Sequence, residues 1–230
     1  MGFAAPFTII GHRGAAGLEP ENTLRSFRRA FELGVHAVEL DVYAVEGRLV
    51  VIHDDRLERT TNGAGLVAAT PLPLLRTLDA GSGERIPLLE DVFAAVPDGV
   101  GVNVELKGPG TAGALVPLLR TFPHVEVLVS SFKHRELREF RALDASTRVA
   151  VLYQRTDPAM LETARELDAF AINLSNELAT PQRVAEVTGA GYRCFVYTVN
   201  DPVRAKALAA MGASGVFTDR PDRVSATAIS

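Results

Sequence analysis

Short apolar runs alternate with segments of helical periodicity along the whole chain. Between the runs, apolar residues recur at helical spacing, as at Leu24, Phe27 and Phe31, so each segment has one apolar stripe that can cover a sheet. This alternation is typical of parallel strands joined by helical crossovers. Eight runs are predicted as strands, at residues 7–10, 37–42, 100–106, 125–129, 148–152, 169–174, 194–199 and 215–217.

The number of strand–helix units favours one fold class, α/β. Eight units in 230 residues fit a closed (β/α)8 TIM barrel better than an open sheet, with a doubly wound sheet as the alternative. No change of composition divides the chain, so we expect a single domain over residues 1–230. One stretch departs from the strand–helix alternation. Residues 47–52 are predicted as an extra strand. Residues 55–85, which are rich in Thr, Gly and Pro, are predicted as a short insertion after the second strand, over the barrel mouth.

Composition and charge exclude several classes of protein. The formal net charge is −4 and no run of Lys or Arg forms a basic patch, so we expect no nucleic-acid partner. The chain shows neither a signal-peptide pattern nor a long apolar segment, which predicts a cytoplasmic protein without stable membrane insertion. The single cysteine, Cys194, lies in an apolar run and is interpreted as a buried hydrophobic residue. Nothing here determines the oligomeric state.

Acidic side chains occupy one face of two predicted strands. In AVELDVY the period of two places Glu39 and Asp41 on the same side, and in VNVELKG it does the same for Glu105 and Lys107. If the apolar faces pack against the helices, these charged groups point into the barrel near the carboxyl ends of the strands. Barrel enzymes carry their active sites at that end.

Three converging carboxylates repel one another and lose hydration unless a cation compensates. A hard divalent ion such as Mg²⁺ or Ca²⁺ prefers oxygen ligands and would relieve the repulsion. We therefore interpret Glu39, Asp41 and Glu105 as candidate metal ligands. The alternative is a salt-bridge network with Arg13 and Lys107 and no metal, but two basic groups do not neutralise three acids.

Two histidines end strands beside this predicted cluster. His12 follows the first strand and His53 follows the extra strand. Because imidazole titrates near neutrality, such a pair can supply one acid and one base. Arg13 and Lys107 add two positive charges suited to an anion. A metal, an arginine and a lysine around one point indicate a phosphoryl group as the target.

A series of short motifs follows in one order along the chain, and together they resemble the glycerophosphodiester phosphodiesterase family over nearly its whole length. The motifs are HRG at residues 12–14, PENT at 20–23, ELDV at 39–42, VVIHD at 50–54, RTTNGAG at 59–65, IPLLEDV at 86–92, VELK at 104–107, SSF at 130–132, YTVN at 197–200 and GVFTDRPD at 215–222.

The resemblance implies a (β/α)8 barrel that hydrolyses a small-molecule glycerophosphodiester to glycerol 3-phosphate and an alcohol. In that family the positions matching Glu39, Asp41 and Glu105 hold one divalent cation, usually Mg²⁺ or Ca²⁺. The glycerol hydroxyl would attack phosphorus, and water would open the cyclic phosphate. Direct attack by water is the rival mechanism.

The resemblance also implies roles for the residues around the metal. Positions matching His12 and His53 act as general acid and base, without indicating which is which, and those matching Arg13 and Lys107 contact the phosphate. Phe132 and Tyr197 are candidates for the pocket wall. The family usually has tryptophan at the latter position, whereas this chain contains none, so the preferred alcohol is not predicted.

Two other activities fit the same barrel: lysophospholipase D-type cleavage of a lipid, and release of a cyclic phosphate as the product. A third hypothesis is a barrel that binds phosphate without catalysis. Binding alone would need the arginine and lysine but not two histidines with a metal site, so hydrolysis is the favoured interpretation.

Overall fold

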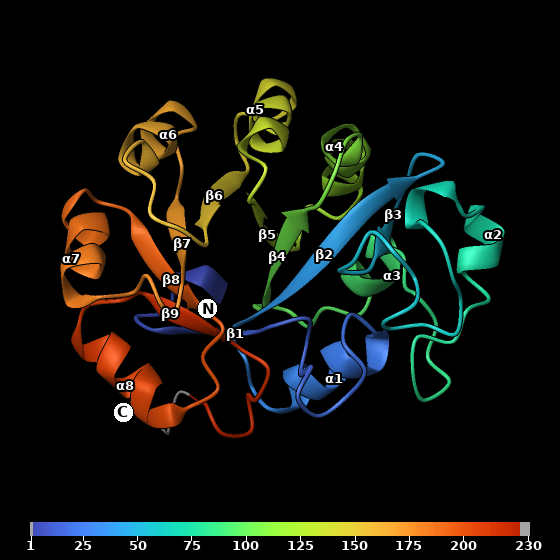
Figure 1. Cartoon of the computed structure of the whole chain (residues 1–230), viewed down its shortest axis with the longest axis horizontal. Helices are drawn as coiled ribbons and strands as arrows, with labels where there is room; N and C mark the ends of the chain where they lie inside the picture. Colours follow the sequence, from blue (N-terminus) through green and yellow to red (C-terminus); the bar gives the residue numbers. More distant parts are fainter. Residues whose placement is uncertain (1, 226–230) are drawn as a thin grey trace.

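A computed structural model describes residues 2–225 as a barrel of eight parallel strands (Figure 1). The barrel order is β1-β9-β8-β7-β6-β5-β4-β2, and pairing of β1 with β2 closes it. The predicted (β/α)8 barrel is therefore confirmed. The barrel strands are β1 (Thr8–Gly11), β2 (Ala37–Val45), β4 (Gly101–Leu106), β5 (Glu126–Ser131), β6 (Arg148–Tyr153), β7 (Ala171–Ser175), β8 (Arg193–Tyr197) and β9 (Gly215–Thr218).

Helices ring the barrel outside these strands (Figure 1). Hydroxyl and carboxylate side chains begin several of them: Thr23 accepts a hydrogen bond from the Ser26 amide at the start of α1, and Thr180 caps α7. The ring helices are α1 (Leu24–Glu32), α4 (Thr111–Thr121), α5 (His134–Leu143), α6 (Met160–Glu166), α7 (Pro181–Gly189) and α8 (Pro202–Ala210).

Apolar side chains of the barrel form two clusters, one outside the strands and one inside. The outward faces of the strands pack under the helices, where Leu40 and Val104 lie beside Phe27 and Phe140 in the main core. A second cluster inside the barrel contains Phe3 from the 3₁₀ helix η1 (Gly2–Ala4), together with the strand residues Ile10, Leu128, Phe195 and Phe217. Because the inner cluster is apolar, the polar residues of the interior gather toward the carboxyl ends of the strands.

The segment after β2 forms an addition at the side of the barrel (Figure 1, right). Strand β3 (Arg48–Val51) pairs antiparallel with β2, within the predicted extra strand at residues 47–52. Beyond it lie η2 (Val67–Ala69), α2 (Leu72–Leu75) and α3 (Leu89–Phe93). The segment has its own small core, made by Val50, Leu57, Val67, Leu75 and Ile86 among others. In residues 2–225 no helix has the length and apolar character needed to span a membrane.

Candidate active site

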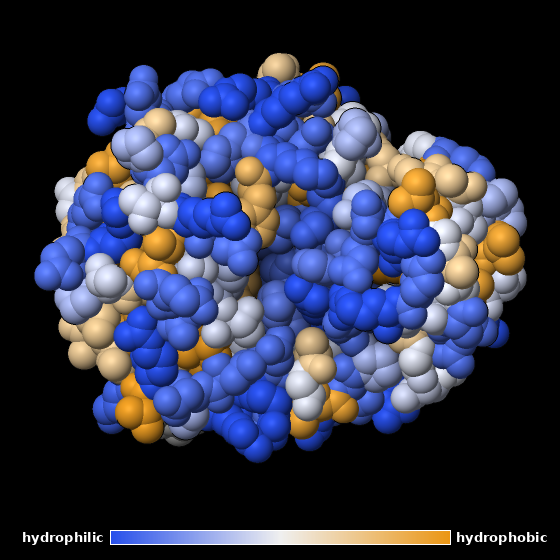
Figure 2. Space-filling view, viewed as in Figure 1, coloured by the Kyte–Doolittle hydropathy of each residue, from blue (hydrophilic) through white to orange (hydrophobic). Residues whose placement is uncertain are grey.

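A cavity of about 280 Å³ lies inside the carboxyl-terminal end of the barrel. In the space-filling view a hollow surrounded mainly by hydrophilic residues lies near the centre of the face (Figure 2). Several predicted residues follow directly after a strand, since His12 comes after β1, Lys107 after β4 and Phe132 after β5. The cavity is lined by His12, Arg13, Glu39, His53, Asn103, Glu105, Phe132, Leu152, Gln154, Tyr197, Thr198 and Phe217.

Three carboxylates meet at the cavity floor. Glu39 and Asp41 come from β2, and Glu105 comes from β4, where it is in register with Asp41. One oxygen from each lies within 4.8 Å of one from the others, and the residues are 3%, 1% and 7% exposed. The alternation along two neighbouring parallel strands thus places all three acids on the inner face.

Burial and mutual repulsion change the acidity of this trio. The pKa of Glu39 lies well above its ordinary value because the side chain is buried beside Asp41 and Glu105. Burial and the charge of Asp41 raise the pKa of Glu105 to about 7. Burial also opposes ionisation of Asp41, but Lys107 and Arg13 outweigh it and lower that pKa. The trio therefore resists full ionisation at neutral pH when no further cation is present.

Two cations compensate part of the charge. Lys107 Nζ lies 2.9 Å from Glu105 Oε1 and 3.3 Å from Asp41 Oδ1. The Arg13 amide donates to Glu39 Oε2 at 2.9 Å, and its guanidinium Nε lies 3.6 Å from Asp41 Oδ2. Two positive groups facing three acids leave an excess of negative charge.

The donor set suits a divalent metal ion. Asp41 Oδ1 is buried and accepts no hydrogen bond, although it contacts the ammonium of Lys107. This buried oxygen therefore has an ion-pair partner but no hydrogen-bond donor. Three clustered carboxylates with such an oxygen match the all-oxygen coordination of Mg²⁺ or Ca²⁺. The trio could therefore hold a metal ion.

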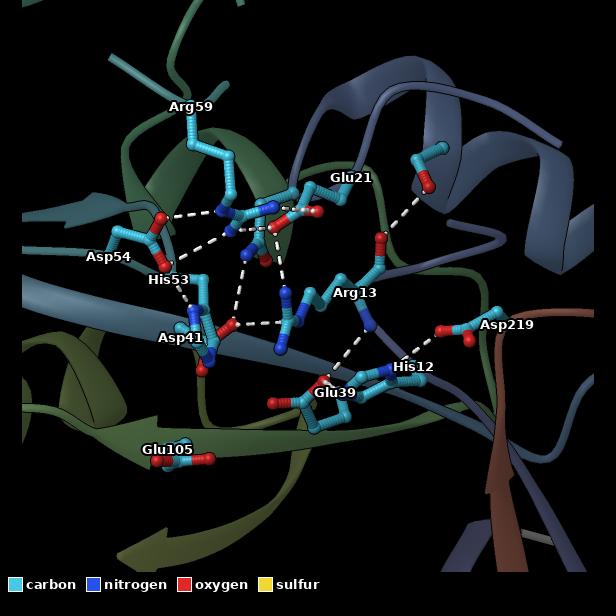
Figure 3. Close-up of polar contacts among 12 residues, drawn as sticks. His12, Arg13, Glu21, Glu39, Asp41, His53, Asp54, Arg59, Glu105 and Asp219 are labelled. Atoms are coloured by element: carbon cyan, nitrogen blue, oxygen red, sulfur yellow. Dashed lines mark hydrogen bonds and ion pairs between the residues drawn. The ribbon is translucent and has the colours of Figure 1, made fainter. Parts of the chain in front are cut away.

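Each histidine at the cavity is held by a carboxylate at Nδ1 (Figure 3). His12 Nδ1 lies 2.6 Å from Asp219 Oδ1, and Asn200 donates to the other oxygen of Asp219 at 2.8 Å. His53 Nδ1 lies 2.6 Å from Asp54 Oδ1. Since a carboxylate accepts the Nδ1 proton, Nε2 of each ring is left to act on a ligand.

The surroundings of His53 also affect its charge. Burial lowers the pKa of His53. The nearby charge of Asp41 and the hydrogen bond between His53 and Asp54 only partly oppose that change. The neutral ring is therefore favoured at neutral pH. By contrast, the pKa of Asp219 is lowered because His12 and Asn200 outweigh the cost of its burial, so this residue remains a carboxylate.

Two aromatic side chains, Phe132 and Tyr197, form part of the cavity wall. The rings of Phe132 and Tyr197 are 5.7 Å apart and nearly perpendicular. The Tyr197 hydroxyl donates to the Tyr153 carbonyl at 2.9 Å, which fixes the ring. Phe132 is 39% exposed, so this wall reaches the cavity entrance.

Sequence reasoning placed every predicted site residue at this one end of the barrel, but it missed the residues that hold them. Asp54 and Asp219 orient the histidines, while Glu21 binds Arg13 and Asn22 binds Asp41. All four lie within the motifs VVIHD, GVFTDRPD and PENT. Their inclusion in those motifs was the available signal, although a motif does not say which side chains meet.

The fold and the site together define an α/β-barrel protein with an acidic, metal-compatible cavity between two histidines. The chain belongs to the glycerophosphoryl diester phosphodiesterase family, whose model matches residues 12–223. The predicted family is therefore confirmed, and with it an enzyme of the phosphodiesterase class.

Relatives match almost the whole chain. The Bacillus subtilis protein YhdW is 38% identical over 93% of this chain and 95% of its own length. A glycerophosphodiester phosphodiesterase of Caldanaerobacter subterraneus is 34% identical, covering 93% and 94%. Among solved structures, a phosphodiesterase of Oleispira antarctica in complex with the product sn-glycerol-3-phosphate is 33% identical, with a TM-score of 0.91 and 96% of both chains covered.

Proposed function

We propose that this chain hydrolyses glycerophosphodiesters to glycerol 3-phosphate and an alcohol, with a divalent cation and two histidines. One observation carries the proposal: a single cavity is lined by His12, His53 and Arg13 and has the acidic trio at its floor. The product complex of the Oleispira antarctica relative supports the same class of substrate.

The metal and the cations would act on the phosphate. Mg²⁺ or Ca²⁺ held by Glu39, Asp41 and Glu105 would supply Lewis-acid stabilisation of the charge that develops on the phosphoryl oxygens. Arg13 would bind phosphate oxygens through its planar guanidinium, and Lys107 would contribute a second positive charge.

The two histidines would move the protons. With Nδ1 bound to Asp219 or Asp54, each ring presents Nε2, and His12 Nε2 lies only 3.9 Å from Glu39 Oε2. One ring would take the proton of the attacking oxygen, from the glycerol hydroxyl or a water molecule, and the other would protonate the leaving alcohol. Where the glycerol hydroxyl attacks, water would then open the cyclic phosphate to glycerol 3-phosphate. The carboxylate partners would fix the tautomer and the ring orientation that these transfers need.

Hydrolysis of glycerophosphocholine and glycerophosphoethanolamine, measured as release of the alcohol, tests the proposal. We expect activity with Mg²⁺ or Ca²⁺, its loss in EDTA and its return when metal is added back. His12→Ala and His53→Ala should each lose roughly 10²-fold or more in kcat. His124→Ala is the matched control, because His124 is exposed and does not line the cavity.

The products separate this activity from its alternatives. Phosphorus NMR distinguishes glycerol 3-phosphate from a cyclic phosphate end product, and a lysolipid assayed in parallel tests lysophospholipase D-type cleavage. Turnover that persists in EDTA, or in either histidine variant at the wild-type rate, would contradict the assigned chemistry. Phosphate binding without turnover of any diester would instead support a non-catalytic barrel.

A further inference from the structure

An arginine of the side addition bridges two carboxylates that contact residues of the candidate active site. Arg59 Nη1 and Nη2 donate to Glu21 Oε2 and Oε1 at 2.7 and 2.8 Å. The same Nη2 donates to Asp54 Oδ1 at 3.1 Å, and Nε donates to Asp54 Oδ2. A planar guanidinium is suited to this double contact because its five N–H groups are fixed in one fork.

Each of these two carboxylates also contacts a residue of the candidate active site. Glu21 Oε1, which accepts from Arg59, also accepts from Arg13 Nη1 at 2.8 Å. Asp54 Oδ1, which accepts from Arg59, also lies 2.6 Å from His53 Nδ1. Figure 3 shows the resulting chain of contacts, in which Arg59 (top) is joined to both Asp54 and Glu21.

We propose that Arg59 is a positioning residue that sets the phosphate-binding arginine and one catalytic histidine together, by holding Glu21 against Arg13 and Asp54 against His53. This inference rests on the function proposed above, because it assigns Arg59 a part in that reaction. Arg59 does not line the cavity, so it would act only through these two carboxylates.

The charges support this arrangement. The hydrogen bond from Arg59 is the main reason that the pKa of Asp54 lies well below its usual range. Burial would raise the pKa of Glu21, but Arg59 and Arg13 lower it. Both carboxylates therefore remain ionised acceptors, which a partner histidine and a partner arginine require.

A positioning role and a purely structural role predict different effects when Arg59 is lost. A structural role would mainly lower stability, whereas a positioning role would mainly lower the rate. The Arg59 side chain is 47% exposed, and ion pairs at such sites contribute little to stability. Misplacement of a reacting group by about 1 Å can nevertheless cost roughly 10²-fold in rate. Loss of Arg59 should thus affect turnover far more than folding.

The test compares Arg59→Met with Arg56→Met in the metal-loaded full chain, using glycerophosphocholine as the substrate. Arg56 lies in the same segment and pairs with the exposed Glu58, which makes it the matched control. For Arg59→Met we expect kcat to fall at least about 10-fold and KM to rise several-fold, while the melting temperature changes by only a few degrees. Arg56→Met should match the wild type.

A second variant guards against a folding defect. Arg59→Lys keeps the charge and most of the aliphatic stem but lacks the fork that contacts both carboxylates. It should fold and still show the lower kcat. Wild-type kinetics in the folded lysine variant would overturn the proposal, because charge alone would then be sufficient.

A double-mutant cycle tests whether Arg59 acts through Glu21. If it does, the KM of the Glu21→Ala/Arg59→Met double variant should equal that of Glu21→Ala alone, since Arg13 has already lost its support. Independent, multiplying effects on KM would overturn the proposed route. If the wild type hydrolyses no glycerophosphodiester, the proposed function itself fails; if it does and Arg59→Met has its kcat and KM within twofold, only the role of Arg59 fails.

Discussion

Replacing Glu105 by glutamine should stabilise the metal-free protein above neutral pH while removing its ability to bind the metal. Glu105 is 7% exposed and shares the cavity floor with Glu39 and Asp41. Its substitution leaves two acids facing Arg13 and Lys107. An amide oxygen at this position can still accept the hydrogen bond that Lys107 donates to Glu105.

The size and sign of the effect follow from the pKa of Glu105, which is raised from 4.5 to about 7. At about 1.4 kcal/mol per pKa unit, ionisation in the folded state costs about 3 kcal/mol. Because the folded state holds this proton more tightly than the unfolded state, the free energy of unfolding falls as pH rises from about 4.5 to about 7. Below that window the carboxyl is neutral in both states and no cost arises.

Urea unfolding in EDTA at pH 5 and pH 8 provides the measurement. The stability of Glu105→Gln relative to the wild type should increase by about 2.5 kcal/mol between the two pH values, because a small part of the cost is already present at pH 5. Adding Mg²⁺ or Ca²⁺ at pH 8 should then stabilise the wild type but not the variant. Glu139→Gln, which removes a half-exposed carboxylate paired with Arg135 on α5, is the control and should show no such change.

Parallel pH dependences of the variant and the wild type would contradict this prediction. If Glu105→Gln and the wild type lose stability equally between pH 5 and pH 8 in EDTA, the buried trio carries no electrostatic cost. The argument for a compensating cation at this floor would then lose its main physical support.

Three further predictions concern the trio, the barrel seam and the core. Burial and neighbouring acids raise the pKa of Glu39 and Glu105, so metal binding should release protons and should strengthen as pH rises toward and past 7. Calorimetry in two buffers of different protonation enthalpy can detect the released protons. Asp219→Asn should lower kcat by roughly 10²-fold with little change in KM, because a neutral amide lacks the charge that stabilises protonated His12 and no longer fixes its tautomer. Steady-state kinetics measure this, and an unchanged kcat would contradict it. Phe27→Ala, at a fully buried position, should cost about 3–5 kcal/mol in urea unfolding.

The strand faces explain how much of the site could be predicted from sequence. Glu39, Asp41 and Glu105 converge because a period of two fixes which side chains share a face, and β2 and β4 pair with Asp41 opposite Glu105. The period of two is a local property of each strand, and the pairing involves only two neighbouring strands. The acidic trio was therefore predictable once alternating units indicated a barrel.

The partners of the histidines depend on more distant contacts. His12 meets Asp219, 207 positions away, only because β1 pairs with β9 in the register that sets Gly11 beside Thr218. No periodicity in the sequence specifies that register. Asp54 adjoins His53 in the chain, but its orientation depends on Arg59, whose segment has irregular structure.

The two histidines are thus anchored by different parts of the fold. The seam between the first and last strands holds His12, whereas the side addition holds His53 through Asp54 and Arg59. A change confined to the addition should therefore misplace one proton-transfer group and leave the other in position. Both groups meet at the cavity because β2 pairs with β1 near its start and with β3 near its end. The same edge of β2 thus joins the two supports. The acidic trio on β2 and β4 lies between them, so the closed barrel is what gives independently held groups a common centre.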